Sequence, residues 1–392
     1  MAFAHYIRSG QKRLRCGYTT GTCAALAAAG AARFLLTGIA PELVRLQTPK
    51  GIPVEVPLTD ASCDGKTARG AVEKDAGDDA DITGGLRIYA AVSRTDAPGI
   101  AIDGGEGVGR VTKPGLDQPP GAAAINRVPR QMIAAAVKAE CAAAGYGGGM
   151  QVVISIPGGG AAARKTFNPG LGIEGGLSIL GTSGIVEPMS EQAIVDTIAA
   201  AQRQAAASGA KHIVLTPGNY GLDFLRSRTD LQAVPWVKCS NFIGDALDIA
   251  AVEGFASVLL AGHIGKLVKL AGGVMNTHSK YADCRLELFC AHAALCGANT
   301  ETCRALTQCA TTDGAVRVLD RAGLRQPVLT SLLDAIQRHL ERRAGGAFQV
   351  GAIVFSNEYG VLGQTKTVEE IIRLWNKESF TASASDQETR NC

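Results

Sequence analysis

Short apolar runs alternate with Ala-rich, helix-like segments through the second half of the chain. Each of four runs leads through a Gly-containing loop into a helical segment. The runs span residues 177–180, 212–216, 234–239 and 257–261. Strands that alternate with helices in this way predict a parallel sheet with right-handed crossovers and helices on both of its faces. We therefore expect a doubly wound, mostly parallel, Rossmann-like α/β domain over residues 161–375.

The remaining C-terminal segments extend this pattern. We expect helices over residues 282–295, 301–309, 328–343 and 368–375, and a buried strand over residues 352–355. The last stretch, residues 376–392, is polar, and we expect it to be a disordered tail.

The first half mixes strands and helices without strict alternation. A Thr/Gly turn runs into an Ala-rich helix at residues 17–36, and a second Ala-rich helix is expected over residues 126–144. We expect strands within residues 42–58, 86–92 and 150–156, and an irregular surface loop over the acidic residues 60–85. This mixture favours an α+β domain over residues 1–160.

The composition is that of a globular protein with an ample core. Of the 392 residues, 46% are hydrophobic and 19% are charged, with a net charge of +3. This mild charge, without a block of Lys or Arg, argues against nucleic acid as a partner. The sequence has neither a signal peptide nor an apolar run of the roughly 18 residues that span a membrane. We therefore expect a cytoplasmic protein without a membrane partner, and the sequence leaves a homo-oligomer open.

The cysteines and glycines refine this picture. Eleven cysteines without a CxxC pair argue against a disulfide scaffold, and we interpret those after residue 280 as small apolar residues, with no metal site. The 48 glycines fall in short clusters beside apolar runs. Such clusters indicate tight strand-to-helix turns, some of which could cradle a ligand.

The turn Thr19-Thr20-Gly21-Thr22 lies where the first helix begins. A Thr at this position accepts a hydrogen bond from a first-turn N–H group. The other free N–H groups, with the positive end of the helix dipole, form a seat for a carboxylate or phosphate. Two interpretations stay open: a turn that binds an anionic substrate, or a capped helix of the core.

A glycine-rich stretch at residues 102–116 is a second candidate for holding an anionic group. Its glycines allow close approach of the backbone, and Arg110 and Lys113 follow directly. The alternative is a glycine-rich hairpin without a ligand.

The loops after the four predicted strands of the second half mix Gly with polar residues. In an open parallel sheet, ligands bind beyond the carboxyl ends of the strands. We therefore expect a small-molecule site here, although no loop is a full GxGxxG fingerprint or a Walker P-loop. The candidate residues are Gly181, Thr182, Pro217, Gly218, Asn219, Gly221 and Asp245. Asp245 could bind ribose hydroxyls, or be an ordinary acid in the first turn of a helix.

The fourth of these loops adds a histidine and two cations. His263, Lys266 and Lys269 could bind carboxylates, or could bind a metal axially. The alternative for His263 is a capping or core histidine.

These motifs together resemble one family. The stretch LRCGYTTGTCAA at residues 14–25 is similar to the opening signature of the CbiD family, the cobalt-precorrin-5B C-1 methyltransferases of anaerobic cobalamin biosynthesis. The resemblance covers about residues 12–375 and includes GGEGVGRVTKPGL, LTPGNYG, SNFIGDALDIA and AGHIGKLVKLAGG. The strings TTGTCAA and GHIGKLVKLAGG are long and specific, and the departures from the family pattern are small.

The resemblance implies that S-adenosylmethionine donates a methyl group to ring carbon C-1 of a cobalt-containing tetrapyrrole. It also implies a fold unlike that of other corrin methyltransferases. We expect the methyl donor at the strand ends of the second half, and His263 or Asp103 as the base if one assists. The substrate carboxylates would meet Thr19, Thr20, Gly21, Thr22, Arg110, Lys113, Lys266 and Lys269.

Two other functions stay open from the residues alone. A nucleotide-dependent kinase or synthetase would need a phosphate loop ending in GK[ST], but Leu267 follows GHIGK where the hydroxyl should be. A non-catalytic corrinoid carrier would bind the tetrapyrrole without transferring a methyl group.

Overall fold

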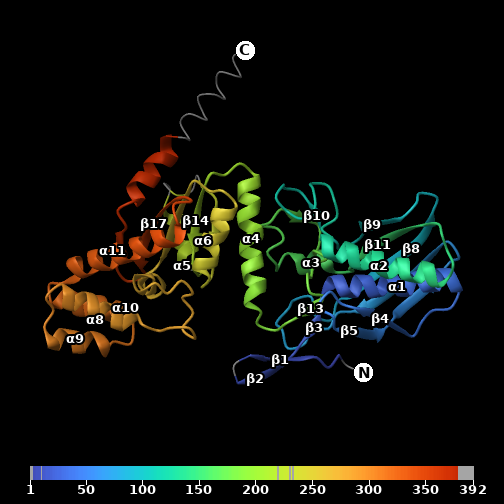
Figure 1. Ribbon diagram of the computed structural model, residues 1–392, viewed down its shortest axis with the longest axis horizontal. Helices are drawn as coiled ribbons and strands as arrows, with labels where there is room; N and C mark the ends of the chain where they lie inside the picture. The colour runs from blue at the N-terminus through green and yellow to red at the C-terminus, as the bar shows by residue number, and fades with distance from the viewer. Residues whose placement is uncertain (1–2, 10, 219, 229–230, 232–233, 378–392) are drawn as a thin grey trace, which may run out of the picture. The chain divides into compact units, whose positions relative to one another are not determined.

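The computed structural model describes residues 3–9, 11–218, 220–228, 231 and 234–377. The chain divides into two compact units, Met1–Glu191 and Gln192–Cys392 (Figure 1). Each unit contains one five-stranded sheet, so the chain is a mixed α/β protein. The division lies after Glu191, whereas the sequence pattern placed it after residue 160.

The first unit is built on a sheet with the strand order β6-β7-β8-β11-β9. The strands β6, β7, β8 and β11 pair antiparallel, and β9 lies parallel to β11 at one edge. They are β6 (Thr59–Cys63), β7 (Thr67–Glu73), β8 (Arg87–Thr95), β9 (Ile100–Gly104) and β11 (Gly149–Ser155). The expectation of an irregular loop over residues 60–85 is therefore wrong for residues 60–73, whereas residues 74–85 contain neither helix nor strand. Ala68 and Val72 of β7 are fully buried, and this apolar content outweighs the acidic residues around it.

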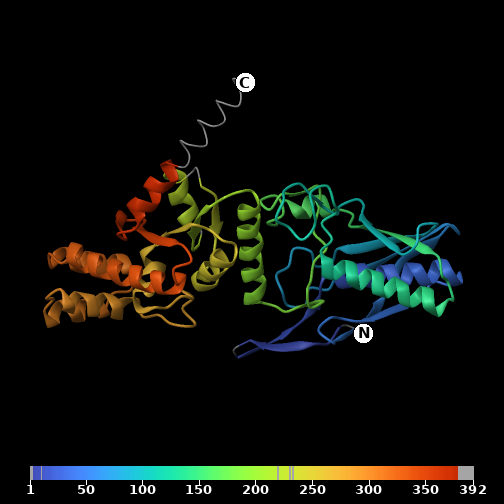
Figure 2. The same ribbon diagram turned by 45° about the horizontal axis from the view of Figure 1, so that its top comes forward.

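Helix α1 (Thr20–Thr37) is the central helix of the first unit. It packs on β7 and β8 and along α2 (Arg127–Ala143), and both views show the two helices side by side (Figures 1 and 2). Residues 20–32 of the helix are buried on every side, which fits their mostly apolar composition, whereas Arg33 and Thr37 near its end are exposed. Its small residues permit close packing: a Cβ atom at Gly30 would lie 2.7 Å from Leu58 Cδ1. Among the described residues, α1 alone is long and apolar enough to cross a membrane, and its surface is mostly buried in the core of this unit.

Residues 161–191 belong to the first unit because two short strands pair there. β12 pairs with β10, and β13 pairs with β3. These strands are β3 (Gly17–Tyr18), β10 (Arg110–Val111), β12 (Ile173–Glu174) and β13 (Ile185–Val186). The strand expected at residues 177–180 forms isolated bridges to Val108 and Ile125 of the same unit. It is therefore not a strand of the parallel sheet, and three rather than four of the predicted strand–helix units build that sheet.

The other elements of the first unit are two hairpins and a short helix. The hairpin expected within residues 42–58 is present. The elements are β1 (Tyr6–Ser9), β2 (Lys12–Arg15), β4 (Leu43–Gln47), β5 (Pro53–Pro57) and α3 (Gly159–Ala163).

The second unit contains a mostly parallel sheet with the strand order β15-β14-β16-β17-β18. β14, β15, β16 and β17 are parallel, and β18 pairs antiparallel with β17 at the edge. The strands are β14 (His212–Thr216), β15 (Trp236–Lys238), β16 (Ser257–His263), β17 (Gln349–Ser356) and β18 (Gly360–Gln364). The chain leaves β14 for β15 on one side and returns to β16 on the other. The strand order therefore reverses between β14 and β16.

Helices cover both faces of this sheet, and the strands alternate their buried side chains between them. Leu215, Leu260 and Val354 face one core, whereas Val214 and Leu259 face the other. The first core is formed with α4 (Glu191–Ala207), α6 (Ile243–Val252) and the helices between β16 and β17. The second is formed with α5 (Tyr220–Ser227) and a helix over residues 368–377.

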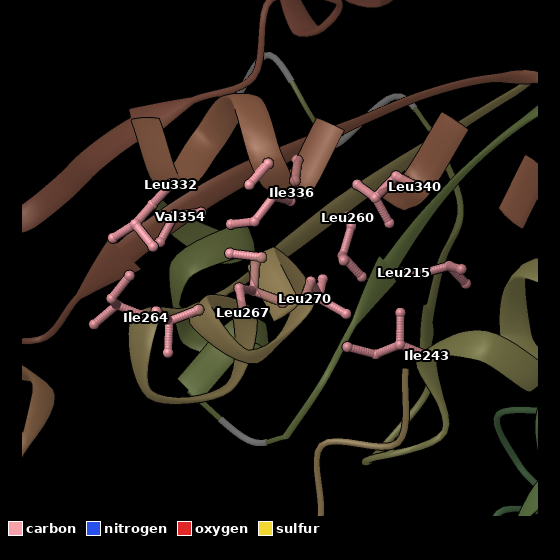
Figure 3. Packing of buried hydrophobic residues seen from close by; sticks show 14 of the residues in the cluster. Leu215, Ile243, Leu260, Ile264, Leu267, Leu270, Leu332, Ile336, Leu340 and Val354 are labelled. Carbon is pink, nitrogen blue, oxygen red and sulfur yellow. The ribbon is translucent and has the colours of Figure 1, made fainter. Parts of the chain in front are cut away.

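A helical segment between β16 and β17 closes the first of these cores. Ile264, Leu267 and Leu270 pack against Leu332 and Ile336 (Figure 3). Helix α10 and strand β18 were not predicted from the sequence. The segment comprises α7 (Ile264–Leu267), the 3₁₀-helix η2 (Val268–Gly272), α8 (Arg285–Leu295), α9 (Thr300–Thr307), α10 (Thr312–Arg321) and α11 (Arg325–Ala344).

Candidate functional site

The carboxyl ends of β14 and β16 form the candidate site of the second unit. These neighbouring parallel strands end at Thr216 and His263, and the strand order reverses between them. In open α/β sheets the crevice beyond such a reversal is where ligands bind. We call this edge of the sheet the switch-point rim. It is defined by residues 216–218, 240–241 and 263–266, which lie at or just after the ends of β14, β15 and β16.

Gly218 and Lys266 meet at the switch-point rim. Gly218 has a φ of +88°, and a Cβ atom placed on it would lie 3.3 Å from Lys266 Nζ. Glycine therefore serves two purposes here, since it adopts the left-handed conformation and leaves room beside the amine. Burial lowers the pKa of the Lys266 ammonium, and Lys238 and Lys269 add to this effect, whereas Cys239 opposes it.

Lys266 reaches the loop after β15 as well. Its Nζ lies 3.5 Å from the carbonyl oxygen of Ser240, a long hydrogen bond. Ser240 has a φ of +54°, which is uncommon for a residue other than glycine. Strained backbone of this kind clusters at ligand-binding and catalytic sites. Lys266 has no carboxylate partner among the described residues, so its charge is available to an anionic ligand.

His263 caps helix α7. Its Nδ1 accepts a hydrogen bond from the N–H group of Gly265 at 3.1 Å. Its ring lies edge-on to Phe355, with centroids 5.9 Å apart, and is also 5.9 Å from the ring of Tyr220. Burial lowers the pKa of His263, and the carboxylate of Asp313 partly opposes this effect.

Lys269 is not a ligand-binding cation, which corrects the prediction from the sequence. Its side chain is almost fully buried, and Nζ donates to the carbonyl oxygens of Thr277 at 3.1 Å and Ala282 at 2.7 Å. The N–H group of Thr277 in turn donates to the carbonyl oxygen of Asn241 at 2.9 Å. The hydroxyl of Thr277 donates to Asn241 Oδ1 at 3.2 Å. Lys269 therefore holds the segment that supports the loop after β15.

The other predicted residues of the second unit lie around the same edge. Pro217 is buried, and a Cβ atom at Gly221 would lie 1.6 Å from Thr216 Oγ1, so any other residue there would force the Thr216 side chain to move. The Thr216 hydroxyl is buried without a hydrogen-bond partner in the described structure. Asp245 is exposed in the first turn of α6, after the edge strand β15. Asn219 lies outside the described residues.

Gly181 and Thr182 do not follow a strand of the parallel sheet. Their loop belongs to the first unit, where it covers the start of α1. A Cβ atom at Gly181 would lie 2.3 Å from Thr19 Oγ1. Their expected place at the end of a parallel strand is therefore wrong, because the preceding apolar run is not one of the strands of that sheet. Their binding of the cofactor stays a prediction.

The start of α1 is a capped core helix rather than an open anion seat. Thr19 Oγ1 accepts from Thr22 N at 3.2 Å, and Gly21 N donates to the carbonyl oxygen of Leu180 at 3.0 Å. Thr20 Oγ1 accepts from Leu180 N at 3.0 Å. Protein groups thus occupy the N–H groups of Gly21 and Thr22, and all four residues of the turn are buried. Of the two interpretations of this turn, the structure favours the cap.

Asp103 and Arg110 neutralise each other. Arg110 donates to both carboxylate oxygens of Asp103, at 2.8 Å and 2.9 Å, and to the carbonyl oxygen of Gly104 at 2.9 Å. These hydrogen bonds hold the pKa of Asp103 below its usual range, which makes it a weak base. Lys113 is exposed, and its side-chain stem packs over Gly172.

The glycines of the GGEGVGR stretch permit tight packing of backbone on backbone. A Cβ atom at Gly107 would lie 1.9 Å from the carbonyl oxygen of Ile156, and one at Gly176 would lie 2.3 Å from that of Gly107. A Cβ atom at Gly159 would also lie 2.3 Å from the carbonyl oxygen of Gly107. These glycines therefore join three segments of the first unit, which explains their spacing without a ligand.

The sequence reasoning missed three residues of the switch-point rim and its surroundings. Ser240, Asn241 and Tyr220 lie in the loops that the pattern singled out, yet nothing in the sequence signals the left-handed backbone of Ser240. Tyr220 was detectable as an aromatic residue in a strand-to-helix loop, and it is 61% exposed. The described residues contain no group of three His, Cys, Asp or Glu side chains placed to hold a metal ion.

The chain is similar to known proteins along most of its length. Residues 7–188 match the family model described as CbiD, and residues 276–366 match that of the CbiD C-terminal domain. The cobalt-precorrin-5B C(1)-methyltransferase of Ruminiclostridium cellulolyticum is 46% identical over 352 residues, which are 90% of this chain and 91% of that protein. The enzyme of the same name from Alkaliphilus metalliredigens is 42% identical over 373 residues, 95% and 98% of the two chains.

A solved structure is similar as well. The crystal structure of the cobalamin biosynthesis protein CbiD from Archaeoglobus fulgidus is 29% identical, covers 71% of this chain and 86% of that chain, and aligns with a TM-score of 0.39. The two enzymes above extend over nearly the whole of this chain at more than 40% identity. The chain belongs to the CbiD family.

Proposed function

We propose that this chain is a cytoplasmic enzyme that methylates ring carbon C-1 of cobalt-precorrin-5B to give cobalt-precorrin-6A, with S-adenosylmethionine as the methyl donor. Two relatives named cobalt-precorrin-5B C(1)-methyltransferase align with this chain along 91% and 98% of their own lengths. The likeness thus extends over whole proteins rather than over a shared domain, and it supports the methylation activity.

The methyl donor fits the switch-point rim best. The observation that carries this assignment is the meeting of Gly218 with Lys266, because a side chain at position 218 would fill the space beside the amine. A doubly wound, Rossmann-like sheet binds ligands at such a reversal of strand order. Pro217, Gly218 and Gly221 would line the donor, and Asp245 is the carboxylate offered to ribose hydroxyls at the neighbouring strand end.

Lys266 is the cation that we assign to a ligand carboxylate. It is half-buried and lacks an acidic partner in the described structure, and burial lowers its pKa. A carboxylate beside it would restore the favourable environment of the ammonium. Both the methyl donor and the tetrapyrrole carry carboxylates. Of the other predicted cations, Arg110 is paired with Asp103 and Lys269 is buried, so Lys113 is the remaining exposed candidate in the first unit.

The residues of the rim suit a direct displacement. When bound, S-adenosylmethionine supplies an electrophilic methyl group, and its transfer needs alignment and a site that excludes water. The glycine at position 218 admits a ligand close to the backbone, and the rings of Tyr220 and His263 lie together at the strand ends. Asp103 is too well stabilised as a carboxylate by Arg110 to act as an effective base.

Transfer of a radiolabelled methyl group from S-adenosylmethionine to cobalt-precorrin-5B tests the activity. We expect labelled product whose mass has gained one methyl group. Lys266→Met should weaken ligand binding, whereas Lys366→Met, which removes an exposed ammonium 4.0 Å from Glu341, should not. A chain that binds the tetrapyrrole without transferring label would be a carrier and would contradict the proposal.

A further inference from the structure

The two ring nitrogens of His263 have different surroundings. Nδ1 accepts the N–H of Gly265 at 3.1 Å, and a backbone N–H group can only donate. Nδ1 therefore carries a lone pair, and the neutral ring carries its proton on Nε2. In the described structure, Nε2 has no hydrogen-bond partner. The ring thus presents an N–H donor on the edge opposite the cap.

The position of this donor is fixed from three sides. β16 and β17 pair in a register that places His263 directly beside Phe355, whose ring meets the imidazole edge-on at an interplanar angle of 89°. The ring of Tyr220, from α5, is tilted by 43° to the imidazole, and the two ring centroids lie 5.9 Å apart. The cap to Gly265 fixes the rotation of the ring. A donor held in this way is preorganised for a ligand.

We propose that His263 is a ligand-binding residue whose Nε2–H donates to a carboxylate oxygen of a bound ligand, and that it is not a general base. This inference rests on the proposed function, because it takes the switch-point rim as the ligand site. A base needs a free lone pair, and in this tautomer the lone pair is occupied by Gly265. Lys266, three residues further along, supplies the positive charge that a carboxylate needs beside a neutral donor.

The protonation state supports a neutral donor. The titratable groups that face the ring are Asp313 from α10, which favours protonation, and Tyr220 from α5. Burial outweighs Asp313 and lowers the pKa of His263. Protonation would also place a hydrogen on Nδ1 and break the cap of α7.

Two substitutions separate the roles of the two nitrogens. In His263→Asn the amide oxygen can accept from Gly265, since Asn is among the best capping residues, but no donor reaches the position of Nε2. In His263→Gln the amide nitrogen can reach that position, but the cap is weakened. We expect His263→Asn to fold normally and to lose about tenfold in ligand affinity, the effect of one hydrogen bond to a charged group. His263→Gln should keep its affinity within about threefold and unfold more easily.

Calorimetric titrations with S-adenosylhomocysteine alone and with the tetrapyrrole alone identify which ligand supplies the carboxylate. If both variants bind both ligands normally but transfer no methyl group, His263 is a base and the inference is wrong. If each variant loses ligand affinity in proportion to its loss in free energy of unfolding, His263 has only a structural role. That result would also contradict the inference.

A spectroscopic measurement tests the tautomer independently of any ligand. Long-range ¹H–¹⁵N spectra of the whole ¹⁵N-histidine-labelled protein, with His263→Gln used for assignment, should show a proton on Nε2 and none on Nδ1 near pH 7.5. A proton on Nδ1 would overturn the inference even if the enzyme proves active. Conversely, wild-type protein that binds neither ligand would contradict the proposed function, while the spectrum would still decide the tautomer.

Discussion

The amine of Lys266 lies so close to Gly218 that a Cβ atom on the glycine would be 3.3 Å from Nζ. The two residues follow β14 and β16, which are neighbours in the sheet although β15 lies between them in the sequence. Their meeting therefore depends on the reversal of strand order between β14 and β16. This relationship is what makes the switch-point rim a candidate site rather than a set of separate loops.

Gly218→Val should weaken the binding of S-adenosylhomocysteine by at least about tenfold, because a side chain would fill the space beside Lys266. Gly209→Val is the matched control. Gly209 has a φ of +87°, close to that of Gly218, but has no neighbour within 4 Å and precedes β14. Both variants should lose about 1–3 kcal/mol of stability from backbone strain. Calorimetric titration of both variants measures the difference, and equal affinities would remove Gly218 from the site.

Lys269→Met should destabilise the second unit by about 2 kcal/mol, since it leaves the carbonyl oxygens of Thr277 and Ala282 without their donor. Urea unfolding provides the measurement. Lys366→Met, at a side chain that is 69% exposed, should change the free energy of unfolding by less than about 0.5 kcal/mol. A Lys269→Met variant as stable as this control would show that the amine is not a structural support.

As the pH is lowered, the free energy of unfolding of the wild type should decrease more steeply than that of His263→Gln. Burial lowers the pKa of folded His263 below 6.5, and Asp313 only partly opposes the shift. The unfolded chain therefore binds a proton that the folded chain does not, and the free energy of unfolding falls as pH falls from about 6.5 through the folded pKa. His292 has a lowered pKa as well but is present in both proteins. Equal slopes in unfolding experiments between pH 7.5 and 5 would contradict the shift.

Gly107→Ala should prevent the first unit from folding or cost at least about 3 kcal/mol, because its Cβ atom would lie 1.9 Å from the carbonyl oxygen of Ile156. Gly121→Ala is the control, since Gly121 also has a positive φ, +89°, but has no neighbour within 4 Å. We expect it to cost about 1 kcal/mol. Circular dichroism and urea unfolding would detect the difference. Two variants of similar stability would argue that close packing is not the reason for glycine at position 107.

The sequence predicted the regular elements well where local pattern decides them. The strand expected at residues 212–216 is β14, and the helix expected at residues 126–144 is α2 (Arg127–Ala143). The apolar run at residues 177–180 has the composition of a buried strand, which is why it was predicted to be one. Its actual partners, Val108 and Ile125, are distant in sequence, and nothing local indicates such bridges.

The candidate site was only partly predictable for the same reason. Gly218, His263 and Lys266 could be named as candidate site residues because ligands bind beyond the carboxyl ends of parallel strands, and the order of elements along the sequence indicates where those ends lie. This rule could not distinguish Lys266 from Lys269, since both follow β16 and only the fold shows which amine is enclosed. Nor could it show that Arg110 is occupied by Asp103, because the pairing depends on how the chain turns between them.

The location of bound S-adenosylhomocysteine tests the central claim most directly. A crystal structure of the chain with this product should show it at the switch-point rim, with Gly218 against the ligand and a ligand carboxylate beside Lys266 Nζ. A product molecule bound elsewhere, with the carboxyl ends of β14 and β16 unoccupied, would contradict the account.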